Sequence, residues 1–274
     1  MFSGLDDIDW ARFDEEREYG RLAVEVPQLI RNLLSDDEDT RWWALQDLFG
    51  EGQHHGTHCP ETPYIIPFLL EILALPQHPA REGIYHGFAA LGKNLIHATT
   101  IPGMRLAVQI FDELRKGLSL YLRAISDDET TIRRECIRFS RYMQDDTQTI
   151  LHALLDQYRR EPEPVIRATV LESLGGMMTD KSIYADPFAP CVTLFKQVLF
   201  NTPYHSLFER IAAASILVRF GPNSIDYTDE VHQAIGQLIQ EGQQPDVVTY
   251  HTNLEIDFGD LVEVYNQNAN IRQS

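Results

Sequence analysis

The 274-residue chain is short of basic residues, with 23 lysines and arginines against 41 aspartates and glutamates and a formal net charge of −18. This surplus of acid argues against nonspecific binding to the phosphates of nucleic acids or to anionic membranes. It suits a soluble protein with a basic protein partner. The acids gather at the ends: residues 1–61 hold 15 acids and 5 bases, and residues 220–274 hold 9 acids and one base.

The sequence also lacks the marks of export and of membrane insertion. No segment approaches the roughly 18 consecutive apolar residues that a spanning helix needs. The first residues, with Asp6, Asp7 and Asp9, have neither the basic region nor the apolar run of a signal peptide. Three cysteines are an odd number, and we interpret them as free thiols in a reducing compartment. We therefore expect a cytoplasmic protein that neither spans nor binds a membrane.

Signatures of catalysis are missing as well. The sequence contains neither a glycine-rich phosphate loop nor a nucleophile elbow. Ser206 follows His205, but adjacency in sequence does not supply the geometry of a catalytic triad. Acidic pairs such as Asp127-Asp128 are typical of helix caps. We predict a noncatalytic protein without a cofactor.

What the chain does have is one helical pattern that recurs five times. In each copy an arginine is followed at +3, +4 and +7 by small or apolar residues, the spacing that buries one face of a helix. The arginines are Arg41, Arg81, Arg133, Arg167 and Arg210. Their separations of 40, 52, 34 and 43 residues indicate stacked helical hairpins.

These patterns predict an all-α chain in three parts. Residues 1–24 form an acidic N-terminal cap, residues 25–242 form about five helical hairpins, and residues 243–274 form a capping tail. The third hairpin is predicted to begin with one long helix that runs from Ala107 to Ile125. The tail shows no clean helical period, and Leu254, Ile256 and Phe258 alternate like a short strand. A capping tail without a strand is the alternative.

The first hairpin resembles a HEAT repeat. The resemblance rests on Val26-Pro27, on Leu33 to Asp37, and on the stripe from Arg41 to Gly50. It extends over roughly residues 25–240, and the region around His55-Gly56-Thr57 is similar to bacterial HEAT-repeat proteins. The resemblance implies a right-handed α-solenoid. Arg81 departs from the pattern because no turn aspartate precedes it.

One loop is rich in metal-ligand side chains. Its candidates are His54, His55, His58, Cys59 and Glu61. Such groups bind zinc or copper, but their spacing fits no closed zinc pattern, and Gly56 and Pro60 prevent a helix from aligning them. We interpret the segment as an inter-repeat loop that contributes His54 and His55 to partner binding. A metal site with a metal-dependent activity is the alternative.

Two further groups are candidates for partner binding. Arg134, Arg138 and Arg141 share one face of the second helix of the third hairpin, and they could hold a carboxylate or phosphate of a partner. The alternative is a solvated face paired with neighbouring acids. Trp42 and Trp43 point about 100° apart on their helix, so one indole can enter the buried stripe while the other leans toward the neighbouring hairpin or solvent. We expect burial between repeats. An exposed indole would instead be a binding hot spot.

Stacked hairpins present a preformed surface, which favours binding over catalysis. We expect the concave surface and the inter-repeat loops to bind a basic protein, which the acidic ends attract. The most specific hypothesis is an immunity-type inhibitor of a basic toxin. A scaffold or chaperone-like helper, of which the HEAT-like bilin lyases are an example, is the alternative.

Overall fold

The computed structural model describes residues 2–16, 22–49, 59–95, 101–143, 146–179, 188–221, 224–242 and 258–273. Helices and turns account for all of the regular structure in these ranges, and no strand occurs within them. None of the helices described is long and apolar enough to cross a membrane. The predicted all-α fold is confirmed.

The chain divides into two compact units, Met1–Met143 and Gln144–Ser274. The N-terminal unit begins with three short 3-10 helices, η1 (Leu5–Asp7), η2 (Trp10–Glu16) and η3 (Ala23–Glu25). Its α-helices are α1 (Val26–Asn32), α2 (Glu38–Phe49), α3 (Thr62–Leu73), α4 (Arg81–Leu95), α5 (Ile101–Arg115), α6 (Leu118–Ala124) and α7 (Thr130–Ser140). The C-terminal unit contains α8 (Thr147–Arg160), α9 (Pro164–Thr179), α10 (Ala189–Phe200), α11 (Leu207–Arg219), α12 (Asp229–Gly242) and α14 (Phe258–Gln273).

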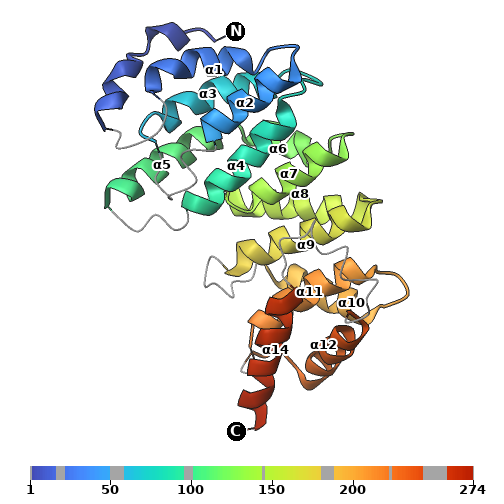
Figure 1. The fold of residues 1–274 in the computed structure, drawn as a ribbon. Helices are drawn as coiled ribbons and strands as arrows, with labels where there is room; N and C mark the ends of the chain where they lie inside the picture. The colour runs from blue at the N-terminus through green and yellow to red at the C-terminus, as the bar shows by residue number, and fades with distance from the viewer. Residues whose placement is uncertain are drawn as a thin grey trace. The chain divides into compact units, whose positions relative to one another are not determined.

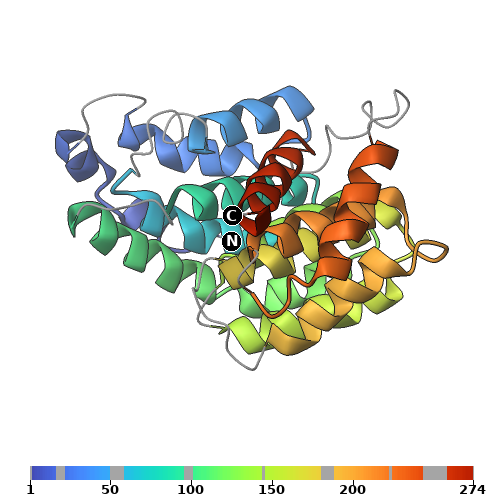
Figure 2. The same cartoon turned by 90° about the horizontal axis from the view of Figure 1, so that it is seen from below.

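The recurrent helical stripe is the inner face of α2, α4, α7, α9 and α11. All three stripe positions are buried in the last four of these helices, whereas α2 buries Ala44 and half-buries Leu45 and Leu48. In the N-terminal unit, α4 packs between α2 and α7 (Figure 1). In the C-terminal unit, α11 packs against α9, α10 and α14 (Figure 2). The stacking of successive hairpins within each unit is therefore as predicted.

The anchor arginines hold the turns that precede their helices. Nη1 of Arg41 donates hydrogen bonds to the carbonyl oxygens of Ser35 (2.8 Å) and Asp36 (2.9 Å). Arg133 and Arg167 repeat this contact with the carbonyls six and five residues before them. Carbonyl groups at the end of a helix have no partner within it. Arg41, Arg133 and Arg167 therefore satisfy carbonyls of these turns, which explains their position just after them.

The prediction of one long first helix in the third hairpin is wrong, because this segment forms two helices, α5 and α6, separated by Lys116-Gly117. A Cβ atom at Gly117 would lie 2.5 Å from both Leu70 Cδ2 and Tyr121 Oη. The hydroxyl of Tyr121 donates to the carbonyl of Leu114 (2.7 Å), at the end of α5. Tertiary packing at this point therefore requires a glycine and a turn.

The tail, whose sequence shows no clean helical period, nevertheless contains a helix, because residues 258–273 form α14. Leu254 and Ile256 lie outside the described residues. The buried positions of α14 include Leu261 and Asn268, and the side-chain amide of Asn268 donates to the carbonyl of Val218 (2.8 Å) at the end of α11. Because Asn268 is polar, the spacing of apolar residues alone does not show the helical period of this segment.

Candidate functional site

Trp42 and Trp43 lie on the outside of α2, where 50% and 61% of each residue is exposed. Their ring centroids are 4.6 Å apart and their planes meet at 79°, an edge-to-face pair. The expectation that they are buried between repeats is therefore wrong. Because both indoles are exposed, they are candidates for a binding hot spot.

Close packing of α2 on α4 excludes the two indoles from the interior. A Cβ atom at Gly83 would lie 2.3 Å from Leu45 Cδ1, and one at Gly87 would lie 2.5 Å from Phe49 Cδ2. The contact therefore uses Leu45 and Phe49 against two glycines on one face of α4. The tryptophans occupy another face of α2, so this interface leaves them outside.

Carboxylates accompany the tryptophans on the exposed face of α2. Glu38 and Asp39 are exposed in the first turn and stand four residues before Trp42 and Trp43. Residues four apart on a helix are surface neighbours. We call the surface of Glu38, Asp39, Trp42 and Trp43 the acidic aromatic face. It combines apolar area with negative charge on one rigid helix.

A second polar cluster joins α4 to α7. The Glu135 side chain is buried, and it lies 3.1 Å from His86 Nδ1, 2.9 Å from Arg134 Nε and 3.4 Å from Arg138 Nη1. The hydrogen bond to Glu135 raises the pKa of His86. Burial alone would raise the pKa of Glu135, but the contacts with His86, Arg138 and Arg134 lower it to about 2. No local motif could reveal His86, because its partner Glu135 is 49 residues away in the sequence.

The three arginines predicted for partner binding are thus only partly on a free surface. Arg134 and Arg138 hold the buried carboxylate of Glu135, a neighbouring acid of the kind that the alternative interpretation invoked. The Arg141 guanidinium lies 4.6 Å from the ring centroid of Tyr142, a cation–π distance. Their contact with a partner stays a prediction.

The histidine-rich loop falls mostly outside the described residues, which exclude His54, His55 and His58. Cys59 is partly exposed, and Glu61, at the start of α3, is fully buried. Among the residues that the structure describes, no three histidine, cysteine or acidic side chains converge as metal ligands would. All three cysteines are free thiols, and burial raises the pKa of Cys191 to about 12.

The anchor arginines also link successive hairpins through carboxylates. Arg81 forms an ion pair with Asp127, from the turn before the next second helix. In the C-terminal unit, Arg167 donates from Nε to Glu209 Oε1 (2.8 Å) and from Nη2 to Glu209 Oε2 (3.0 Å). The missing turn aspartate before Arg81 does not prevent this link, because the acid comes from the following hairpin.

Glu209 is the centre of a larger network in the C-terminal unit. It also accepts hydrogen bonds from Tyr158 Oη (3.0 Å) and from Ser206 Oγ (2.8 Å), and His205 Nδ1 lies 3.2 Å away. Burial alone would raise its pKa, but the bonds from Arg167, Ser206 and His205 lower it to about 2. Ser206 and Glu209 form the capping box of α11. Ser206 therefore caps the first turn of α11.

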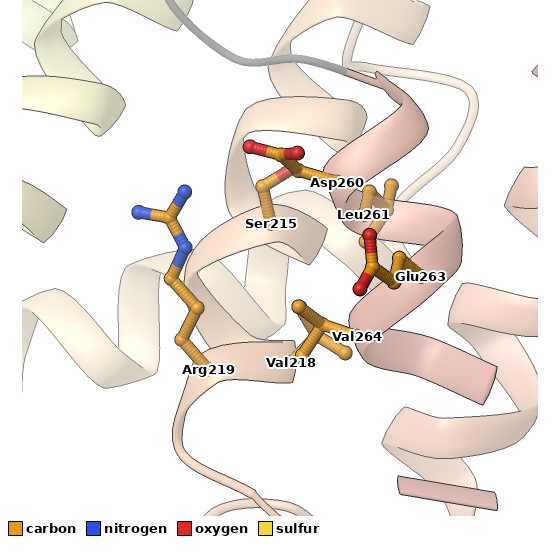
Figure 3. A pocket seen from close by; sticks show the side chains of 7 residues that line it. All are labelled: Ser215, Val218, Arg219, Asp260, Leu261, Glu263 and Val264. Atoms are coloured by element: carbon orange, nitrogen blue, oxygen red, sulfur yellow. The ribbon is translucent and has the colours of Figure 1, made fainter. Parts of the chain in front are cut away.

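Two hollows in the C-terminal unit differ in size. The smaller, about 200 Å³, lies between α11, which carries Arg219, and α14, which carries Asp260 and Glu263 (Figure 3). This is below the roughly 300 Å³ at which ligand pockets usually begin. The larger, about 660 Å³, lies over the Glu209 network and is lined by residues of α8, α9, α10 and the loop before α11. Its components are scattered over 51 residues of sequence, so no local motif reveals it.

Comparisons with known proteins do not assign a family. No family model matches the chain, and no curated protein matches it. Among solved structures, the chain is similar to a crystal structure described as an engineered protein from a structural genomics consortium. That likeness has a TM-score of 0.48 and 14% sequence identity, and it covers 89% of this chain and 97% of the other. It carries no argument about function, and membership of the HEAT family stays a prediction.

Proposed function

We propose that this chain is a noncatalytic binding protein whose acidic aromatic face captures a basic protein. The observation that carries the proposal is the exposed pair Trp42 and Trp43 beside Glu38 and Asp39. Tryptophans are enriched among residues that dominate binding energy, and lysine and arginine side chains stack favourably on indole rings. A basic segment can therefore meet both its charge partner and its aromatic partner on one helix.

The energetics favour capture by a preformed surface. Each indole still has half or more of its surface to bury, and truncation of such an anchor in a complex typically costs about 2 kcal/mol or more. Because a helix supplies both rings, little conformational entropy is lost on binding. The net charge of −18 accelerates the encounter with a cationic partner and makes that rate sensitive to salt.

The most specific form of the proposal is an immunity-type inhibitor of a basic toxin, such as a nuclease. Enzymes that act on nucleic acids carry positive surfaces that attract phosphates. An acidic protein with exposed aromatic anchors can occupy such a surface and exclude the substrate. Acidity and the acidic aromatic face support this form. The HEAT-like, bacterial and cytoplasmic character predicted from the sequence agrees with it.

The test is titration of the full chain with purified cationic nuclease toxin domains at low and high salt, followed by calorimetry. We expect binding that weakens steeply with salt and a loss of about 30-fold in affinity for Trp43→Ala, equivalent to about 2 kcal/mol. Met104→Ala, which removes an exposed apolar side chain from α5, serves as the matched control. Glu38→Lys should slow association more than it speeds dissociation.

Two outcomes would reject this function. One is the absence of binding to every cationic toxin domain tested. The other is binding that ignores both salt and the loss of Trp43, which would instead favour a scaffold that uses another surface.

A further inference from the structure

The larger cavity of the C-terminal unit has the size of a ligand site and belongs to no part of the proposed protein interface. Its volume of about 660 Å³ lies within the usual range of roughly 300 to 1,000 Å³ for small-molecule pockets. Its walls combine aliphatic, aromatic and amide side chains. They are Leu155, Tyr158, Arg159, Glu161, Arg167, Pro190, Thr193, Leu194, Gln197, Asn201, Tyr204 and His205.

Charges at the cavity already have partners in the protein. Arg167 is paired with the buried Glu209, and Arg159 is paired with Asp156 at 2.6 Å. The carboxylate of Glu161 accepts a hydrogen bond from Gln157 Nε2 (2.7 Å), and its charge helps to raise the pKa of Arg167. A charged ligand would lose its hydration without gaining an unpaired counter-charge. The cavity therefore suits an uncharged ligand.

The network beneath the cavity also determines how His205 is presented. Glu209 is ionised and can only accept hydrogen bonds, so the proton of His205 lies on Nδ1, 3.2 Å from Glu209 Oε1. In the neutral ring, Nε2 is then a hydrogen-bond acceptor. Tyr158 directs its hydroxyl proton to the same carboxylate oxygen. One acceptor in a fixed orientation thus lies in the cavity wall.

The cavity lining also offers two carboxamides and apolar surface. Gln197 and Asn201 line the cavity four residues apart, at the end of α10, and each carries one acceptor and two donors in a plane. Leu155 and Leu194 supply aliphatic area. Tyr204, which is 82% exposed, supplies an aromatic ring at the rim. A flat ligand with apolar faces and a polar edge satisfies all of these groups.

We propose that this cavity binds a planar, uncharged nitrogen heterocycle of the nucleobase class. Its edge exchanges hydrogen bonds with Gln197, Asn201 and His205, and its faces pack on the leucines and on Tyr204. Side-chain amides read the edges of such rings by paired hydrogen bonds. Aromatic side chains stack on their faces. A saccharide fits less well, because its hydroxyl groups would face the aliphatic wall.

The experiment is calorimetric titration of the full chain with adenosine, guanosine, cytidine and uridine at millimolar concentration, and with glucose and maltose in parallel. We expect saturable binding of at least one nucleoside with a stoichiometry of one. Tyr204→Ala and Gln197→Ala should each weaken it at least about fivefold. The matched controls Phe200→Ala on α10 and Gln237→Ala on α12, exposed positions outside the cavity lining, should leave it unchanged.

A nucleoside 5′-monophosphate distinguishes recognition of the ring from recognition of an anion. We expect the monophosphate to bind no more than about threefold more tightly than its nucleoside, because the arginines are already paired. The proposal is overturned if no nucleoside binds, if only the saccharides bind, if both cavity variants bind as the wild type does, or if the phosphate dominates affinity. None of these results depends on the basic partner of the acidic aromatic face.

Discussion

Removal of the Arg167 guanidinium should strongly destabilise the C-terminal unit, because Glu209 is 0% exposed and would keep its charge with fewer partners. A pKa lowered from the ordinary value of 4.5 to about 2 corresponds to about 3 kcal/mol of stabilisation of the carboxylate. Breaking one side of a buried ion pair typically costs about 3 to 5 kcal/mol. We therefore expect Arg167→Ala to lower the free energy of unfolding by about 3 kcal/mol near neutral pH.

The destabilisation caused by Arg167→Ala should depend on pH in a definite direction. The folded-state pKa of Glu209 is depressed, so its contribution is present above the ordinary value of 4.5 and is lost as pH falls toward about 2. In Arg167→Ala, burial raises the Glu209 pKa, and protonation then relieves the unpaired charge. The difference between wild type and variant should therefore shrink as the pH is lowered from neutral to about 3.

The assay is urea unfolding followed by far-ultraviolet circular dichroism, because all three tryptophans lie in the N-terminal unit and their fluorescence does not report on this site. Arg159→Ala is the matched control, since its ion pair with Asp156 is well exposed and should contribute less than about 1 kcal/mol. The reasoning is refuted if Arg167→Ala costs no more than Arg159→Ala, or if its cost is the same at neutral and acid pH.

Three other predictions concern the N-terminal unit and the thiols. Gly87→Ala should cost about 1 to 3 kcal/mol in urea unfolding followed by tryptophan fluorescence, because its Cβ would clash with Phe49; a gain of about 1 kcal/mol, as helix propensity alone implies, would contradict the close packing. Native protein should show one thiol, Cys59, that reacts rapidly with Ellman's reagent, and rapid reaction of all three would contradict the burial of the others. The His86 pKa should exceed 6.5 in an NMR titration and fall in Glu135→Gln, with no change if the hydrogen bond between them is absent.

Much of the fold could be predicted because helical periodicity is local. The stripe after each anchor arginine lies on one helix, and its burial requires only that some neighbour cover it. Hairpins follow from the turns between stripes. The break at Gly117 was missed because it depends on packing against Leu70 and Tyr121. The helix α14 was missed because Asn268 in its buried stripe is polar and is satisfied by Val218, a residue of a distant helix.

The candidate sites depended even more on distant contacts. Trp42 and Trp43 could be recognised from the sequence as hot spots on condition of exposure, but the condition is met only because two glycines of α4 receive Leu45 and Phe49. Glu135 was recognisable as a neighbour of Arg134, whereas its partner His86 was not. The larger cavity forms only once α8, α9, α10 and the loop before α11 are placed together.

The amino-acid sequence by itself determined the helical class and the buried stripes that follow the anchor arginines, because each stripe depends on residues within about two helical turns of one another. It also determined the acidity that favours a basic partner. The tertiary structure alone decided which side chains remain exposed and which carboxylates are buried with arginines. Those outcomes depend on which faces of distant helices meet, and a pattern along a single helix does not contain that information.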